Sequence, residues 1–167
     1  MRELSRLSLP GDSVAHRQCL LDLSEWETAS TILLYNPLPG EVDLMPLIRG
    51  DDSRKFLFPR IEGEHLQLYR PSGTDEWITH PLGLLEPDPE TWEKASPGEI
   101  DLALIPGLAF DPQGGRLGRG KGFYDRLLGD PDFRGVKIGI CWHWQVVDSV
   151  PYEAHDIRMD LIVSGEK

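Results

Sequence analysis

The chain has 167 residues, of which 40% are hydrophobic, and this length and composition fit one domain over residues 1–167. Its 28 acidic residues outnumber its 17 lysines and arginines, and the formal charge of -11 argues against nucleic acid as a partner. The sequence has no signal-peptide character and no apolar run near the ~18 residues that span a bilayer, so we expect a cytoplasmic protein without membrane contact. Cys19 and Cys141 lack the spacing of zinc ligands and are predicted to be free thiols.

Short apolar runs alternate with amphipathic or turn segments, which is typical of an α/β domain with a largely buried sheet. The expected strands cover residues 31–35, 55–59, 66–69, 102–105, 137–141 and 161–163. The expected helices cover residues 12–22, 43–48 and 123–128, with Asp12 or Ser13 capping the first and Asp43 the second. Residues 70–99, rich in Pro, Gly, Asp and Glu, are expected to be irregular and to form either one wall of a pocket or a plain connection.

Three of the expected loops follow strands, over residues 36–41, 106–122 and 142–148. In an open α/β sheet, ligands bind in the crevice beyond the carboxyl ends of the strands. We therefore expect these three loops to surround the functional site.

The loop over residues 106–122 has the composition of an anion site. An apolar strand leads into glycines at positions 114, 115, 118, 120 and 122, with Arg116, Arg119 and Lys121 between them. Glycine permits positive φ and a close approach of the backbone to a ligand, and successive N–H groups can then bind phosphate oxygens. The loop predicts phosphate chemistry, the alternative being a surface turn with solvated cations.

The loop departs from the common nucleotide-binding motifs. Residues 115–121 fit seven positions of a Walker A motif, but Gly122 stands where a Ser or Thr hydroxyl reaches magnesium. The Rossmann spacing fails as well, because Gly122 comes one residue too early. A metal ion at this loop needs another ligand, and Asp125 is the nearest carboxylate.

Two further segments carry acidic residues at expected strand ends. Asp156 in the tail is a second candidate magnesium ligand beside Asp125, because Mg²⁺ bound to a triphosphate takes one or two protein carboxylates. Capping of a turn is an equally good interpretation of Asp156. Glu41 follows a Pro-Gly turn and is either a site residue or a surface carboxylate.

These segments together resemble the 5-formyltetrahydrofolate cyclo-ligase family, also called methenyltetrahydrofolate synthetase. The resemblance covers the chain from about residue 31 to its end. It rests on PGLAFD (106–111), RLGRGKGFYD (116–125), Glu-Val-Asp after a proline-rich turn (41–43), Gly-x-x-Glu-Pro (83–87), and the tail residues Gln145, Pro151, Asp156 and Asp160.

The resemblance implies a three-layer α/β/α sandwich around a mostly parallel sheet. It also implies conversion of 5-formyltetrahydrofolate to 5,10-methenyltetrahydrofolate, with ATP as co-substrate, Mg²⁺ as cofactor, and release of ADP and phosphate. A monomer is expected. The implied ATP-binding residues are Arg116, Leu117, Gly118, Arg119, Gly120, Lys121, Gly122, Phe123 and Tyr124. The implied catalytic residues are Arg119, Lys121 and Tyr124, the folate-binding residues Asn36, Glu41 and Tyr124, and the magnesium ligands Asp125 and Asp156.

The chain departs from the family pattern near its start. Relatives carry a Lys-x-x-x-Arg pair that contacts ATP, about ten residues ahead of a segment that corresponds here to residues 6–10. Either the protein begins upstream of Met1, or it binds ATP with fewer cations. Leu82 and Phe123 also replace residues that are often aromatic or tyrosine in the family. A paralogue that binds nucleotide or folate without turnover is the alternative interpretation.

Overall fold

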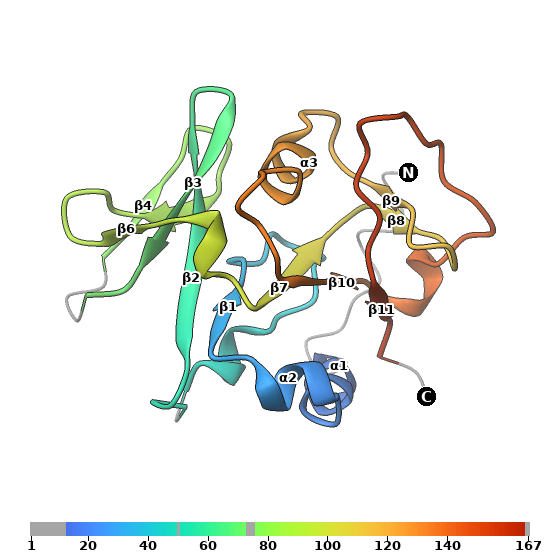
Figure 1. Cartoon of the computed structure of the whole chain (residues 1–167), viewed down its shortest axis with the longest axis horizontal. Helices are drawn as coiled ribbons and strands as arrows, with labels where there is room; N and C mark the ends of the chain where they lie inside the picture. The colour runs from blue at the N-terminus through green and yellow to red at the C-terminus, as the bar shows by residue number, and fades with distance from the viewer. Residues whose placement is uncertain (1–12, 50, 73–75, 166–167) are drawn as a thin grey trace.

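A seven-stranded mixed sheet forms the centre of the molecule (Figure 1). The computed structural model describes residues 13–49, 51–72 and 76–165. The strand order is β11-β10-β7-β1-β2-β3-β6, with parallel pairs from β11 to β2 and antiparallel pairs from β2 to β6. The strands are β1 (Thr31–Leu33), β2 (Lys55–Glu62), β3 (His65–Arg70), β6 (Glu93–Ala95), β7 (Leu102–Pro106), β10 (Val136–Ile140) and β11 (Leu161–Val163).

The remaining elements are short. The α-helices of the described residues are α1 (Ser13–Leu21), α2 (Ser24–Thr28) and α3 (Phe123–Leu128). Single 3₁₀ turns are η2 (Met45–Leu47), η3 (Pro97–Glu99) and η4 (His143–Gln145). Two small hairpins pair β4 (Trp77–Thr79) with β5 (Leu85–Pro87), and β8 (Ala109–Phe110) with β9 (Arg116–Leu117).

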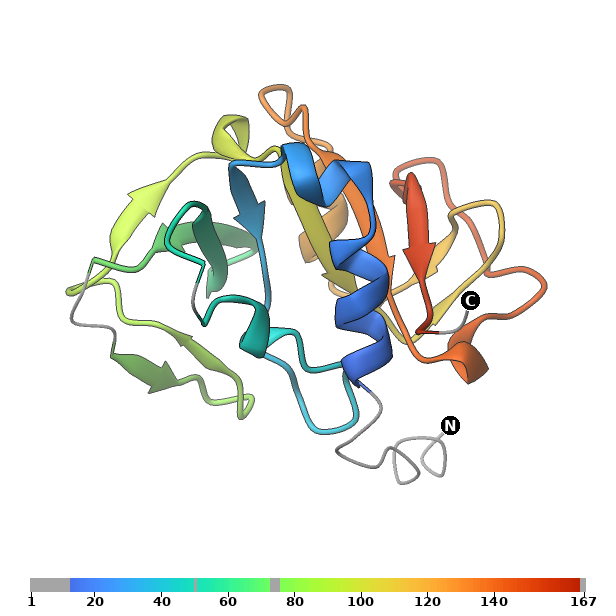
Figure 2. The ribbon, with the colours of Figure 1, turned by 90° about the horizontal axis from the view of Figure 1, so that it is seen from below.

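Two hydrophobic cores lie on opposite faces of the sheet, because successive side chains of a strand point to opposite sides. Helices α1 and α2 cover one face, and Figure 2 shows α1 lying along the strands. Their core is built by Leu20, Trp26, Ile32, Leu34, Leu102, Leu104, Ile138 and Ile140. The core on the α3 side contains Leu33, Leu57, Ala103, Ile105, Leu127 and Leu128. Burial on both faces explains why the parallel strands are almost continuously apolar.

The direction of winding reverses between β1 and β7, which are parallel neighbours. From β1 the chain continues to β2 on one side, whereas β7 is followed by β10 and β11 on the other. The connections after β1 and β7 therefore diverge. In sheets of this type the divergence leaves a crevice at the carboxyl ends of the two strands, where ligands bind.

The expected strands and the helix over residues 123–128 are confirmed, with ends shifted by up to three residues. The helix expected over residues 43–48 is instead the 3₁₀ turn η2. Its N-cap is Leu44 and not the expected Asp43, although Asp43 Oδ1 accepts Met45 N–H (2.9 Å) from one residue further back. The predicted irregularity of residues 70–99 is wrong. They contain β4, β5, β6 and η3, three-residue pieces that are too short for periodicity to reveal.

At the N-terminus, the expected cap Asp12 and the basic residues Arg2 and Arg6 lie outside the described residues. Ser13 lies at the start of α1, and its hydroxyl accepts a hydrogen bond from Asp43 N–H (3.1 Å). The two cysteines are free thiols, as predicted, and burial raises the pKa of Cys141 to about 12. None of the described helices has the length and apolarity needed to cross a membrane.

Candidate active site

A cleft of about 550 Å³ opens where β1 and β7 end. Its lining comes from the end of β7 and the loop that follows, the turn after β1, and the β4–β5 hairpin. The C-terminal segment over residues 145–160, called the tail, completes the lining. All residues that the sequence assigned to the site line this one cleft: Asn36, Glu41, Arg116, Leu117, Gly118, Arg119, Gly120, Lys121, Gly122, Phe123, Tyr124, Asp125 and Asp156. The crevice predicted from the strand order is therefore the place where they meet.

The three cations of the glycine loop have different surroundings. Arg119 and Lys121 are exposed at the cleft, whereas the Arg116 side chain is only 6% exposed. Two glycines beside the exposed cations adopt positive φ, Gly120 at 84° and Gly122 at 65°, and Gly122 directly precedes α3. A side chain at either position would strain this backbone, so the turn into α3 requires glycine.

Arg116 is held inside the cleft by several groups. Its guanidinium lies 3.3 Å from Asp125 Oδ2, donates to Pro106 O (3.3 Å), and stacks over the ring of Tyr124 (5.4 Å to its centre). Its Nε is buried and has no hydrogen-bond partner within the described residues. A buried donor without an acceptor is costly to stability.

The two predicted magnesium ligands occupy neighbouring segments. Asp125 Oδ1 accepts the backbone N–H of Ile157 (3.1 Å), which places the start of α3 against the residue that follows Asp156. Asp156 Oδ2 accepts Glu153 N–H (2.7 Å), so Asp156 also caps a turn, as the alternative interpretation expected.

Within the described residues, no group of three or more His, Cys, Asp or Glu side chains is placed to hold a metal ion. Mg²⁺ commonly uses one or two carboxylates and takes its other ligands from water and substrate phosphates. Asp125 and Asp156 fit that donor set, in a cleft that also has cations for the phosphates.

Glu41 also lines the cleft, and its side chain is 16% exposed. Its Oε2 accepts Leu38 N–H (3.0 Å), and its Oε1 lies 3.4 Å from Arg119. Burial raises the pKa of the Glu41 carboxyl, while Leu38 N–H and Arg119 partly offset that rise. Burial, and then the nearby Glu41 charge, also raise the pKa of Tyr124, so this phenol keeps its proton and can donate a hydrogen bond.

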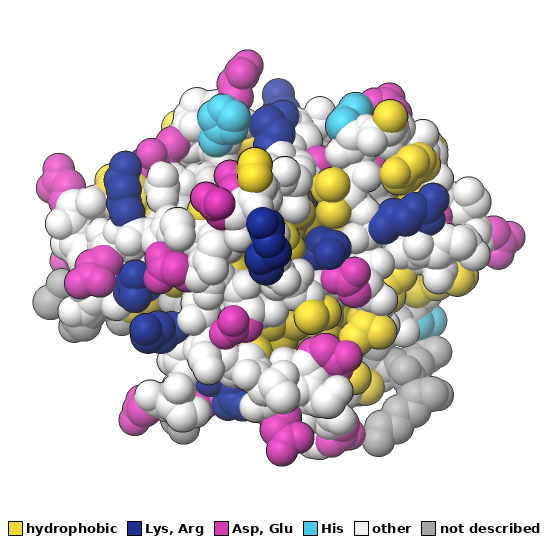
Figure 3. Space-filling view, viewed as in Figure 1, with side chains coloured by type: hydrophobic (Ala, Val, Ile, Leu, Met, Phe, Trp, Pro, Cys, Tyr) yellow, Lys and Arg dark blue, Asp and Glu magenta, His cyan; other side chains and the backbone are white. Residues whose placement is uncertain are grey.

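Apolar side chains also line the cleft. They are Leu38, Ile61, Leu66, Leu82, Leu84, Leu85 and Phe123. Leu82 and Leu85 on the β4–β5 hairpin are 68% and 48% exposed, although both are large and apolar. The cleft thus combines charged side chains of both signs with apolar surface suited to a flat ligand. Acidic and basic side chains are interspersed over the described surface in Figure 3, without a continuous basic face in that view.

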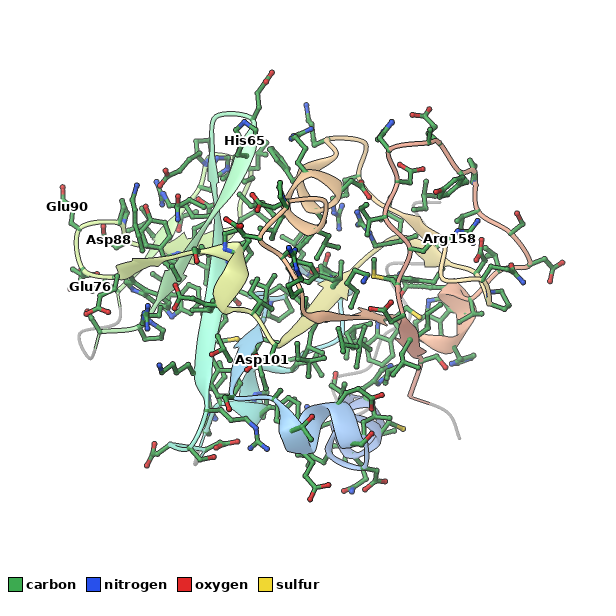
Figure 4. The ribbon with its side chains drawn as sticks, in the orientation of Figure 1. His65, Glu76, Asp88, Glu90, Asp101 and Arg158 are labelled. Atoms are coloured by element: carbon green, nitrogen blue, oxygen red, sulfur yellow. The ribbon has the colours of Figure 1, made fainter. Side chains whose placement is uncertain are left out.

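The tail is hydrogen-bonded to backbone carbonyls of the loop over residues 106–122, the glycine loop. Arg158, labelled beside this loop in Figure 4, donates to Gln113 O (2.9 Å), and Met159 N–H donates to Gly114 O (2.8 Å). Gln145 Nε2 donates to Gly107 O (3.0 Å) and Leu108 O (3.1 Å). The sequence placed Gln145 only within a motif, because bonds between distant segments leave no local pattern.

Asp111 makes three further hydrogen bonds within this region. It is 5% exposed, and its carboxylate accepts the N–H groups of Val150 (2.9 Å), Gly115 (2.9 Å) and Gln113 (3.0 Å). These bonds, that from Val150 foremost, hold the pKa of Asp111 below its usual range. Asp111 thus fixes the entry to the glycine loop against the tail.

Comparisons with known proteins agree with this site. The model of a family described as the 5-formyltetrahydrofolate cyclo-ligase family matches residues 4–165. A 5-formyltetrahydrofolate cyclo-ligase of Mycolicibacterium smegmatis is 37% identical over 147 residues, or 82% of this chain and 74% of that protein. The corresponding protein of Escherichia coli K12 is 31% identical over 83% of this chain and 80% of its own length. The NMR structure of Aquifex aeolicus 5,10-methenyltetrahydrofolate synthetase superimposes with a TM-score of 0.85 and 32% identity, covering 99% of this chain and 86% of that one.

The fold and the cleft therefore define an α/β ligase of folate one-carbon metabolism. The chain belongs to the 5-formyltetrahydrofolate cyclo-ligase family, an enzyme family that uses ATP.

Asp111→Asn tests whether the Asp111 carboxylate holds the glycine loop against the tail. An amide cannot accept all three N–H groups, so we expect the free energy of unfolding to fall by about 3 kcal/mol at pH 7. Because the folded-state pKa of Asp111 is depressed, its stabilisation is present above the unfolded value of about 4 and is lost as pH falls further. Thermal unfolding at pH 7 and pH 3 should therefore show a smaller difference between variant and wild type in acid. Asp132→Asn, at an exposed aspartate, is the control, and an equal difference at both pH values contradicts the assignment.

Proposed function

We propose that this cleft binds ATP and 5-formyltetrahydrofolate together and forms 5,10-methenyltetrahydrofolate, ADP and phosphate. The observation that carries the proposal is that loop cations and the Glu41 turn line one cleft, in a chain of the cyclo-ligase family. Enzymes that transfer phosphoryl groups act mainly by positioning the reactants and stabilising charge. The charged and apolar side chains of this cleft suit both tasks.

In the proposed reaction the formyl oxygen attacks the γ-phosphorus of ATP, and the bond to ADP breaks. N10 of the folate then attacks the activated formyl carbon, the carbon–oxygen bond breaks as phosphate leaves, and N10 loses its proton. Arg119 and Lys121 are the exposed cations that would neutralise the transferring phosphoryl group. Residues 116–124 would hold the triphosphate.

We assign Asn36, Glu41 and Tyr124 to the folate. Glu41 and Tyr124 stand close enough for the Glu41 charge to raise the pKa of the phenol, so both would face the same ligand group. Asp125 and Asp156 would hold Mg²⁺, which when bound neutralises charge on the phosphates. Asp125 is also paired with Arg116, so a proposed magnesium ligand is bonded to a proposed phosphate-binding residue.

Several broader features belong to the same proposal. The chain would be a single domain, a monomer and a cytoplasmic protein. The three-layer α/β/α arrangement is supported by the two cores on opposite faces of the sheet.

The activity is tested by absorbance at the methenyltetrahydrofolate band and by ADP release, with purified protein, 5-formyltetrahydrofolate and Mg-ATP. Equal amounts of both products support the proposal. Binding of nucleotide without either product would favour the non-catalytic paralogue instead.

Lys121→Ala should lower kcat about 100-fold at saturating ATP, because one charge that stabilises the transferring phosphoryl group is lost. The same assay applied to Lys55→Ala, an exposed lysine at the start of β2, should give the wild-type rate. A normal rate for Lys121→Ala would remove this residue from the site.

Asp156→Asn should raise the Mg²⁺ concentration for half-maximal rate about tenfold, because an amide is a weaker ligand than a carboxylate. The amide oxygen can still accept Glu153 N–H, so the turn should persist. Asp148→Asn, at an exposed aspartate of the same tail, is the control. An unchanged magnesium titration for Asp156→Asn would refute the ligand assignment.

A further inference from the structure

The turn that carries Glu41 accepts a hydrogen bond from a residue more than one hundred positions away in the sequence. The indole N–H of Trp142 donates to Gly40 O over 2.8 Å. Gly40 has φ of 91°, so the backbone next to Glu41 is in a conformation that glycine permits and most residues avoid. On the other side of Glu41, Tyr35 Oη donates to Val42 O (2.8 Å). These two side chains therefore hold the backbone on both sides of Glu41, whose carboxylate itself accepts Leu38 N–H and lies 3.4 Å from Arg119.

Trp142 is itself linked through Gln145 to the first residues of the glycine loop. Its backbone N–H donates to Gln145 Oε1 (2.8 Å), while Gln145 Nε2 donates to the carbonyls of Gly107 and Leu108. The Trp142 side chain is 4% exposed and stacks on Trp144, with ring centres 5.3 Å apart and planes at 8°. One hydrogen-bonded bridge thus runs from the Glu41 turn to the segment that leads into the glycine loop.

Neither bridging residue belongs to the described lining of the cleft. Both must act through the backbone that they hold. We propose that Trp142 and Gln145 are positioning residues, which fix the Glu41 turn relative to the glycine loop and so set the orientation of the folate towards ATP. This inference rests on the proposed function of the cleft, because it needs Glu41 to face the folate.

The bridge matters because the two reactants contact different segments. Reactant geometry must hold within a fraction of an ångström for transfer between bound ligands. The loop after β1 and the loop after β7 diverge, and hydrogen bonds between their strands end before the cleft. Beyond that point the Trp142–Gln145 bridge connects the two loops, together with the 3.4 Å contact of Arg119 with Glu41.

The test removes the indole N–H donor and keeps an aromatic side chain at position 142. Trp142→Phe lacks the indole N–H but can still fill the core and stack on Trp144. We expect the Kd and KM for 5-formyltetrahydrofolate to rise about tenfold, and the KM for ATP to stay within about twofold of wild type. Gln145→Leu removes the other half of the bridge and should shift the same constants in the same direction.

Trp92→Phe is the matched control. Trp92 is 5% exposed, and its indole N–H donates to Glu76 O (3.0 Å), a residue that Figure 4 labels at the far end of the molecule. This variant loses the same kind of bond, and its constants for both ligands should match wild type. Melting temperatures of all three variants show how much stability each bond supplies.

The folate Kd, measured by calorimetry, separates this inference from the proposed activity. A wild-type protein without turnover would overturn the activity, while a weakened folate Kd in Trp142→Phe would still support the bridge. A wild-type folate Kd in a folded Trp142→Phe protein would overturn the inference. Equal losses in Trp142→Phe and Trp92→Phe, or equal losses for folate and ATP, would overturn it too.

Discussion

The parallel pairing of β1 with β7 is the constraint on which the site depends. Each strand is hydrogen-bonded to its neighbour, but the chain leaves the two strands in opposite directions. Backbone pairing therefore stops at their carboxyl ends, and the space beyond is open. Asp101 fixes the other end of the same pair, where its Oδ2 accepts the N–H groups of Ser30 and Thr31 (2.9 Å each). A rigid sheet thus ends in two loops that only side chains connect.

Those side-chain connections explain how an acidic chain presents three cations, Arg116, Arg119 and Lys121, at a cleft that carboxylates line as well. Asp111 accepts three backbone N–H groups, and Asp125 pairs with Arg116, so two carboxylates shape the glycine loop rather than neutralise its exposed cations. Arg119 and Lys121 are exposed at the cleft, where a phosphate group would meet them, and Arg119 also lies 3.4 Å from Glu41 Oε1. Burial raises the pKa of Glu41, and Leu38 N–H and Arg119 partly offset that rise. The positions of these charges, more than their number, decide what the cleft can bind.

The sequence predicted much of this and missed what depends on distant contacts. Continuous apolar runs located β7 and β11, and glycines between cations located the loop, because both signals lie within a few neighbouring residues. All thirteen predicted site residues line one cleft, although their roles stay proposals. The three-residue strands β4 to β6 were missed for lack of length. The Arg116–Asp125 pair and the Trp142 bridge to Gly40 could not be predicted, since neither partner carries a local mark of the other.

The most direct test of the central claim is a crystal structure with a non-hydrolysable ATP analogue, Mg²⁺ and 5-formyltetrahydrofolate. The account predicts both ligands in the cleft beyond β1 and β7. The phosphates should lie on residues 116–122, the metal ion at Asp125 and Asp156, and the formyl group between Glu41 and the terminal phosphate. Folate bound elsewhere, or a formyl group turned away from the phosphate, would contradict the account.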